Sequence, residues 1–210
     1  MYTPPAFVET DLLELDRLLG RDPFVSLISS DEGIPFASHL PVLYSRNGER
    51  ALIEGHWARP NPQVAHGGTA LMIVHGPHAY ISPGWYIDKE AAARVPTWNY
   101  AVAHLTGRLE ASTEEAFLAS IVDRLSIRHE TAVGTDWRYE HDNPRLRSQL
   151  RGIVGFRFVP ERIELKFKLS QNHPAANVQG AADGLSKLED PKSHEIAELM
   201  RERLASRAPD

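Results

Sequence analysis

Three polar clusters interrupt otherwise apolar segments of this sequence, and their side chains are of types that bind anions and planar rings. They are SHLP at residues 38–41, GHWARPNPQ at 55–63 and KFKLSQN at 166–172. Arginine and lysine bind phosphate through charge-assisted hydrogen bonds, while serine, histidine, asparagine and glutamine hydrogen-bond the edge of a heterocycle. Trp57, Trp85, Trp98 and Tyr100 can supply apolar cover for such a ring. The alternative is that the polar side chains satisfy loop backbones and the aromatic rings fill the core.

The signatures of several other chemistries are missing. The chain has ten histidines but no HExxH and no compact histidine and carboxylate cluster, so no metal site is expected. It has no cysteine, no GxSxG and neither of the glycine-rich nucleotide motifs GxGxxG and GxxxxGK[ST]. We therefore predict no catalytic residue, and a hydrolase has no support in the sequence.

Composition bounds the class of protein. The 210 residues are 42% hydrophobic and 24% charged, which is typical of a soluble globular protein. No apolar run approaches the roughly 20 residues of a membrane span, and the first residues do not have the pattern of a signal peptide, so a cytoplasmic location is expected. The net charge of −5 argues against DNA binding, because neutralising phosphates requires a basic surface.

The hydrophobic periodicity predicts short strands joined by turns, with helices at the margins. Helices are expected at about residues 10–19, 113–130 and 192–205, and about seven strands between them. A charged helical insert is expected at 88–94, a turn at Pro160 and a loop at 172–185, while Gly107 marks a bulge or a close approach. The sequence therefore predicts one mainly β domain over 1–210, a small antiparallel barrel with helical decoration.

The ordered motifs resemble the PaiB-type family of FMN-binding negative transcriptional regulators over nearly the whole chain. The resemblance rests on SHLP, GHWARPNPQ, HGPHAYISPGWY, VPTWNYAVAHLTGRL, IVGFRF and KFKLSQN, in that order. It implies the FMN-binding split barrel that flavin reductases and pyridoxamine-phosphate oxidases share. It also implies FMN as cofactor and a homodimer with the ligand at the subunit interface.

The resemblance points to two groups of residues for the cofactor. Arg59 is the first choice for the phosphate, because its guanidinium binds phosphate bidentately. The full set expected at the cofactor is Ser38, His39, His56, Arg59, Asn61, Ser82, Trp85, Trp98, Tyr100, Lys168, Ser170, Gln171 and Asn172. The group from Lys168 to Asn172 can come from the other subunit.

Two residues depart from the family pattern near its last strand. Leu165 stands where the pattern has glycine and His173 where it has arginine. A lost glycine can close the space that a ligand needs, and histidine weakens an anionic contact.

The sequence leaves several functions open. The family resemblance implies a flavin-sensing regulator. It also implies DNA as a partner, which the net charge does not support. The alternative is a flavin-dependent oxidoreductase acting on a small molecule. A haem protein with His173 or His75 as axial ligand, or a barrel without cofactor, are weaker alternatives.

Overall fold

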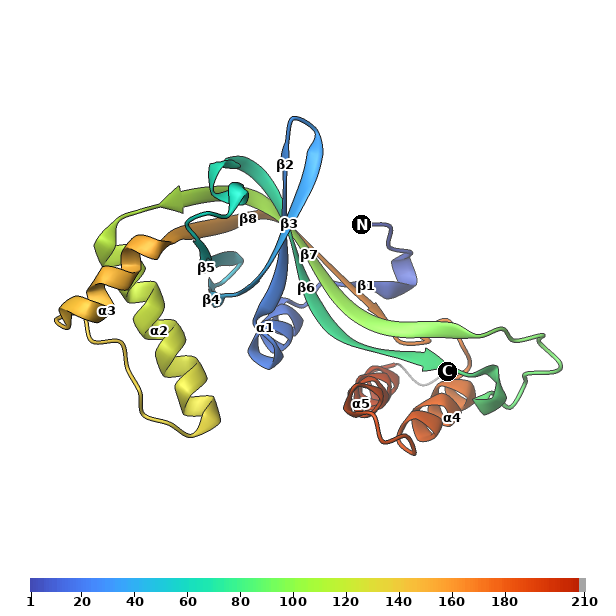
Figure 1. Ribbon diagram of the computed structural model, residues 1–210. Coiled ribbons are helices and arrows are strands. Elements are labelled where there is room, and N and C mark those ends of the chain that lie inside the picture. The colour runs from blue at the N-terminus through green and yellow to red at the C-terminus, as the bar shows by residue number, and fades with distance from the viewer. Residues whose placement is uncertain (208–210) are drawn as a thin grey trace. The chain divides into compact units, whose positions relative to one another are not determined.

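Eight strands form the framework of the protein within residues 1–207, the part that the computed structural model describes (Figure 1). The sheet order is β3-β2-β6-β7-β8-β5-β4, and β1 pairs with β8. The strands are β1 (Val8–Glu9), β2 (Phe24–Asp31), β3 (Ile34–Pro41), β4 (Leu43–Asn47), β5 (Arg50–Ala58), β6 (Gly68–Ile81), β7 (Thr97–Ser112) and β8 (Ile153–Lys168). The pairs β2 with β3, β2 with β6, β4 with β5 and β5 with β8 are antiparallel, which confirms the predicted sheet type.

The three helices that the sequence predicts are present as α1, α2 and α5. The longer helices are α1 (Leu12–Arg21), α2 (Glu115–Val133), α3 (Pro144–Gln149), α4 (Ala175–Leu185) and α5 (Pro191–Ala205), and the 3-10 turns are η1 (Pro5–Phe7), η2 (Pro62–Ala65), η3 (Pro83–Trp85) and η4 (Leu150–Gly152). The Asp11 carboxylate accepts a hydrogen bond from the Leu13 backbone N–H and so caps α1. The helix runs two residues past the expected end at residue 19 and includes Gly20. Within residues 1–207, no helix is long and apolar enough to cross a membrane.

The chain divides into two compact units, which are described separately below. Unit 1 contains residues 1–15, 75–103 and 164 onward, and unit 2 contains residues 16–74 and 104–163. The long strands β6, β7 and β8 contribute residues to both units.

Aromatic packing fills the core of unit 2. Trp57 and Phe156 are fully buried on neighbouring strands, with ring centroids 4.7 Å apart. Gly55 makes room for this packing, because a Cβ there would lie 2.6 Å from the Phe156 ring. The apolar face of α2 buries Phe117 and Ile121. Trp57 therefore belongs to the core and not to a ligand site.

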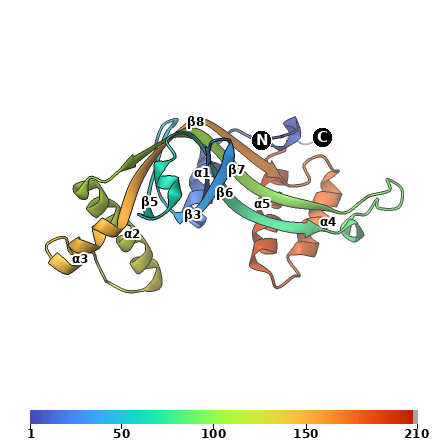
Figure 2. The same ribbon diagram turned by 45° about the horizontal axis from the view of Figure 1, so that its top comes forward.

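In unit 1, helices α4 and α5 lie side by side, as Figures 1 and 2 both show. Asn99 of β7 is fully buried, and its amide donates to Ser170 Oγ at 3.0 Å and approaches the Met200 sulfur of α5 at 3.3 Å. The glycines of α4 leave space for the Trp85 side chain to pack against the helix, since a Cβ at Gly184 would lie 2.5 Å from the indole ring. One face of the unit 1 sheet is therefore covered by these helices.

The turn predicted at Pro160 is wrong, because β8 continues through it. Gly107 of β7 lies against this place: a Cβ on Gly107 would stand 2.1 Å from the Val159 carbonyl oxygen and 2.7 Å from Pro160 Cα. The predicted close approach at Gly107 is thus confirmed. Proline fits an extended strand where its missing N–H is not required, so it does not end β8.

Two further expectations about helices are wrong. The insert at 88–94 consists of turns, since Ala93 has φ +46° and Pro96 lies two residues beyond the insert, which blocks a continuing helix. An ion pair between Arg94 and Asp88 closes the insert. The expected loop at 172–185 contains α4, because its alanine and glycine residues allow close packing against Trp85.

Candidate functional site

A polar pair joins β3 to η2 in unit 2. The Asn61 side-chain amide donates to Ser38 Oγ at 2.9 Å, and its carbonyl accepts from the Gln63 backbone N–H at 2.9 Å. Ser38 is buried and accepts the Asn61 bond, so its own O–H can donate to a ligand oxygen. His39, next on the strand, is exposed and pairs through Nδ1 with Ser26 Oγ at 3.0 Å. Ser38 and Asn61 were both predicted site residues, and the fold brings them together.

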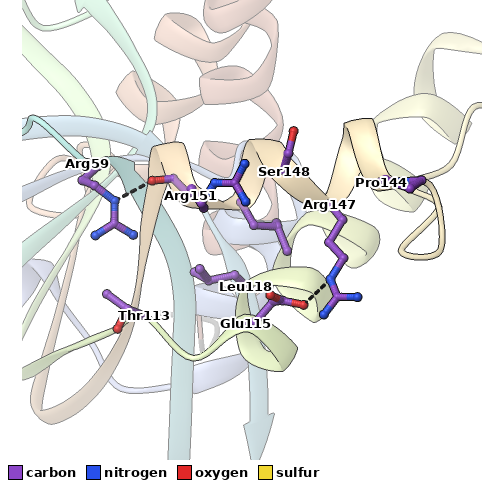
Figure 3. A pocket seen from close by; sticks show the side chains of 9 residues that line it. Arg59, Thr113, Glu115, Leu118, Pro144, Arg147, Ser148 and Arg151 are labelled. Carbon is purple, nitrogen blue, oxygen red and sulfur yellow. Dashed lines mark hydrogen bonds and ion pairs between the residues drawn. The ribbon is translucent and has the colours of Figure 1, made fainter.

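Arg59 lies at the edge of a pocket of about 360 Å³ in unit 2 (Figure 3). Its guanidinium donates to the carbonyl oxygens of Arg151 at 2.5 Å and Ile153 at 3.1 Å. Both acceptors are neutral, so the positive charge of Arg59 is not cancelled by them. Arg147 and Arg151, from α3 and η4, line the same pocket.

The pocket wall carries an excess of positive charge. Its residues include three arginines and one acid, Glu115. Glu115 accepts from Arg147 Nε at 2.6 Å, and His141 Nε2 lies 3.5 Å from the same carboxylate. Three guanidinium groups and one carboxylate in the same pocket wall favour an anionic ligand, and the volume lies within the range of small-ligand pockets.

The sequence did not indicate Arg147 and Arg151 as site residues, although a signal for them was present. They are four residues apart, and in a helix this spacing places two side chains on one face. The basic face of this segment is what forms the far wall of the pocket in Figure 3.

His56 does not line the arginine pocket, although it is only three residues from Arg59. It lines a second cavity in unit 2, of about 340 Å³. Burial lowers the pKa of His56, and its Nδ1 makes no hydrogen bond within residues 1–207. No cluster of three or more histidine or carboxylate side chains suited to a metal ion occurs in that part of the chain.

Two of the aromatic residues predicted for the ligand, Trp98 and Tyr100, lie on a sheet face of unit 1. Trp98 is 53% exposed and Tyr80 is 46% exposed, with ring centroids 6.0 Å apart. Lys166 Nζ lies 5.2 Å from the centroid of the half-buried Tyr100 ring. The side chain of Asn99 points to the opposite, covered face, as strand alternation predicts.

The polar residues at the end of β8 are mostly engaged with their own backbone or neighbours. Lys168 donates to Thr97 Oγ1, and burial lowers its pKa. Ser170 is buried with φ +62° and pairs with Asn99. Gln171 accepts from the Leu169 N–H at 2.6 Å and donates to the Phe167 carbonyl at 2.5 Å, whereas Asn172 is exposed. This segment is therefore a tight turn held by side chains.

Ser82 and Trp85 have structural partners in the connection after β6. Ser82 caps η3, its hydroxyl accepting from the Gly84 N–H at 3.1 Å. The Trp85 indole packs against the α4 glycines described above. The structure thus gives these two residues a role in anchoring the connection.

The two residues that depart from the family pattern lie in unit 1. Leu165 is buried within β8, opposite Glu9 of β1. The His173 ring stacks on Tyr86, with centroids 4.8 Å apart and an interplanar angle of 23°. Burial is the main cause that lowers the pKa of His173, and the nearby Arg94 lowers it further.

The sequence is similar to that of a known family and of a curated bacterial protein. Residues 1–162 match the family described as "Putative FMN-binding domain". The chain is 31% identical over 217 residues to the Protease synthase and sporulation protein PAI 2 of Bacillus subtilis (strain 168), which covers 97% of this chain and 98% of that protein.

Two solved structures share the fold. The FAD and haem binding protein from Mycobacterium smegmatis has a TM-score of 0.52 at 19% identity, over 76% of this chain and 72% of that one. A "putative 5-nitroimidazole antibiotic resistance protein" from Bacteroides thetaiotaomicron has a TM-score of 0.56 at 12% identity, over 76% and 85%. The architecture is the split β-barrel that the resemblance implied. With a family match over most of its length and a relative that covers nearly all of it, this chain belongs to the family of the "Putative FMN-binding domain".

Proposed function

We propose that this chain is an FMN-binding regulatory protein and that the arginine pocket of unit 2 holds the FMN phosphate. The observation that carries the proposal is the match of residues 1–162 to the FMN-binding family, on a split-barrel fold. The M. smegmatis protein of the same fold is named as binding FAD and haem, which supports a flavin as the type of ligand.

The residues present fit a phosphate. Within residues 1–207, the Arg59 guanidinium donates to neutral carbonyl oxygens, and Arg151 lines the same wall. Guanidinium groups bind phosphate with two parallel hydrogen bonds, so Arg59 can exchange its carbonyl partners for phosphate oxygens. When bound, the flavin supplies redox chemistry. The residues of this chain hold its anionic end and fix its position.

The first test compares FMN with riboflavin, which lacks the phosphate. Arg59→Ala removes a charge-assisted contact of about 1.5–3 kcal/mol, so FMN should bind roughly tenfold to a hundredfold more weakly. Riboflavin binding should be unchanged. Arg50→Ala is the matched control, because Arg50 is an exposed arginine at the far end of β5, the strand that precedes Arg59, and it should leave both affinities unchanged.

Titration with flavin fluorescence quenching measures both affinities. If Arg59→Ala weakens FMN and riboflavin equally, the phosphate does not lie in this pocket. If the purified wild-type chain retains neither flavin after dialysis, flavin binding itself is refuted.

We also propose that the exposed aromatic face of unit 1 pairs with a second copy of the chain. Trp98 and Tyr80 expose large apolar rings there, side by side, and such patches mark association surfaces. Size-exclusion chromatography with light scattering should give a dimer for the wild type and a monomer for Trp98→Glu. Trp137→Glu, at a similarly exposed tryptophan of unit 2, should stay dimeric. A monomeric wild type contradicts this part of the proposal.

The regulatory part of the proposal is supported by the relative from B. subtilis, whose name connects it with protease synthesis and sporulation. The competing function is a flavin-dependent oxidoreductase. Anaerobic addition of NADH or NADPH to the FMN-loaded protein separates the two. A flavin that resists both donors supports sensing without turnover, whereas bleaching at catalytic rates supports the oxidoreductase and contradicts a purely regulatory role.

A further inference from the structure

The second cavity of unit 2 has a chemistry different from that of the arginine pocket. It lies between α2 and the segment that contains α3 and η4, and it measures about 340 Å³. Leu150 of η4 lines both cavities. The arginine pocket carries four charged side chains, whereas within residues 1–207 no aspartate, glutamate, lysine or arginine lines the second cavity. Such a wall favours an uncharged ligand, because burying a charge without a partner is costly.

The wall of the cavity is mostly apolar and partly aromatic. Val122 and Leu125 come from α2, and Leu146 comes from α3. Trp137 and Tyr139, from the connection between these helices, add two aromatic rings. Aromatic walls favour a planar ring, which can stack or meet them edge to face.

His56 is the polar group of the cavity that combines burial with a missing hydrogen bond. Its Nδ1 has no partner within residues 1–207. Two of the other polar groups are engaged: Ser126 Oγ donates to the Val122 carbonyl at 2.7 Å, and the Tyr139 hydroxyl pairs with His141 Nδ1 at 3.2 Å. The Gln149 side chain, also in the lining, is exposed to solvent. Burial lowers the pKa of His56, which keeps the imidazole neutral at pH 7. The His56 imidazole lines the cavity, so a ligand hydroxyl placed there can hydrogen-bond the ring.

We propose that this cavity is a second binding site, separate from the flavin site, for a small neutral aromatic molecule with one hydroxyl group, a phenol. The ring contacts the apolar wall, and the hydroxyl hydrogen-bonds the imidazole of His56. A hydroxyl both donates and accepts, so it suits either tautomer of the ring.

The test uses p-cresol as the probe, with toluene and 4-methylbenzoate as comparison compounds, in calorimetric titrations of the full chain. We expect saturable binding of p-cresol, binding of toluene about fivefold weaker for loss of the hydroxyl, and no binding of the charged benzoate. Equal affinity for p-cresol and toluene, or binding of 4-methylbenzoate, overturns the proposal, as does the absence of p-cresol binding.

Variants locate the binding on the protein. Ser126→Leu fills the cavity and should weaken p-cresol roughly tenfold or more, since close-packed sites do not accept added volume. Ser120→Leu is the matched control, because it makes the same change on an exposed position of α2 outside the cavity, and it should leave the affinity unchanged. His56→Phe keeps the ring and removes the hydrogen bond, so it should make p-cresol and toluene bind equally. Unchanged p-cresol affinity in Ser126→Leu refutes the location.

Titration in the presence of saturating FMN separates this site from the proposed flavin site. Unchanged p-cresol affinity supports two sites. Competition between p-cresol and FMN contradicts the inference, because it places the flavin in this cavity. Failure of FMN binding alone leaves the p-cresol result intact, so the two proposals fail independently.

Discussion

Replacing Gly107 by alanine should destabilise the protein, because the added methyl group would have no room. The new Cβ would lie 2.1 Å from the Val159 carbonyl oxygen and 2.7 Å from Pro160 Cα, and both neighbours are backbone atoms. Ordinary van der Waals contact begins at 3.4 Å, so β7 and β8 would have to separate by more than about 1 Å. A backbone hydrogen bond of about 2.9 Å does not survive such a stretch.

The cost combines overpacking, about 1–3 kcal/mol, with one weakened backbone hydrogen bond, about 1 kcal/mol. A total of about 2–4 kcal/mol corresponds to a fall in Tm of roughly 5–15 °C for a chain of this size. Differential scanning calorimetry measures this fall directly. Gly20→Ala is the control: nothing lies within 4 Å of its Cβ and it stands in a helix, so the free energy of unfolding should rise by about 0.4–1 kcal/mol. A Gly107→Ala protein that melts within 2 °C of the wild type, taken here as about the resolution of the comparison, would refute the reasoning.

Two further predictions concern buried polar groups. Gln63→Leu removes the side-chain oxygen that accepts the hydrogen bond of the buried Trp57 Nε1–H at 3.0 Å, so the free energy of unfolding measured in urea should fall by about 1–3 kcal/mol. Gln179→Leu, at an exposed position of α4, is the control and should leave the free energy of unfolding unchanged. Burial lowers the pKa of His56 and His173 in the folded state. The unfolded chain therefore takes up protons before the folded one below about pH 6.5, so the free energy of unfolding should fall as the pH is lowered from 7 to about 5.5. Replacing both histidines by glutamine should flatten this pH dependence. An equally steep pH dependence in the double variant would contradict the prediction.

The sequence predicts elements well where local periodicity and packing agree. The apolar spacing predicts a helix at 113–130, and both ends of α2 lie within three residues of these bounds. Asp11, directly before the first residue of α1, caps that helix. The errors occur at proline and glycine. Pro160 lies within β8 and the α4 glycines lie within a helix, because tertiary contacts with Gly107 and Trp85 override the local signals.

The candidate site was predictable only in part. Ser38 and Asn61 meet as expected, since β3, which carries Ser38, lies against η2, whose first turn Asn61 caps. His56 and Arg59 separate into different cavities, because three positions along an extended strand and its exit point side chains in different directions. The partners of Arg59 are backbone carbonyls more than ninety residues away, and no local pattern specifies them.

The two departures from the family pattern illustrate why a substitution must be read through its surroundings. A leucine in place of glycine closes a ligand site only if its side chain faces that ligand. Leu165 is buried opposite Glu9 of β1, so its added volume fills the core of unit 1. His173 replaces a permanent charge with a ring that stacks on Tyr86 and whose pKa burial lowers, so at neutral pH it contributes an aromatic surface and no charge. Neither change touches the arginine pocket of unit 2, whose wall is built from other residues. The phosphate contact proposed for Arg59 therefore does not depend on the positions at which this chain departs from its family.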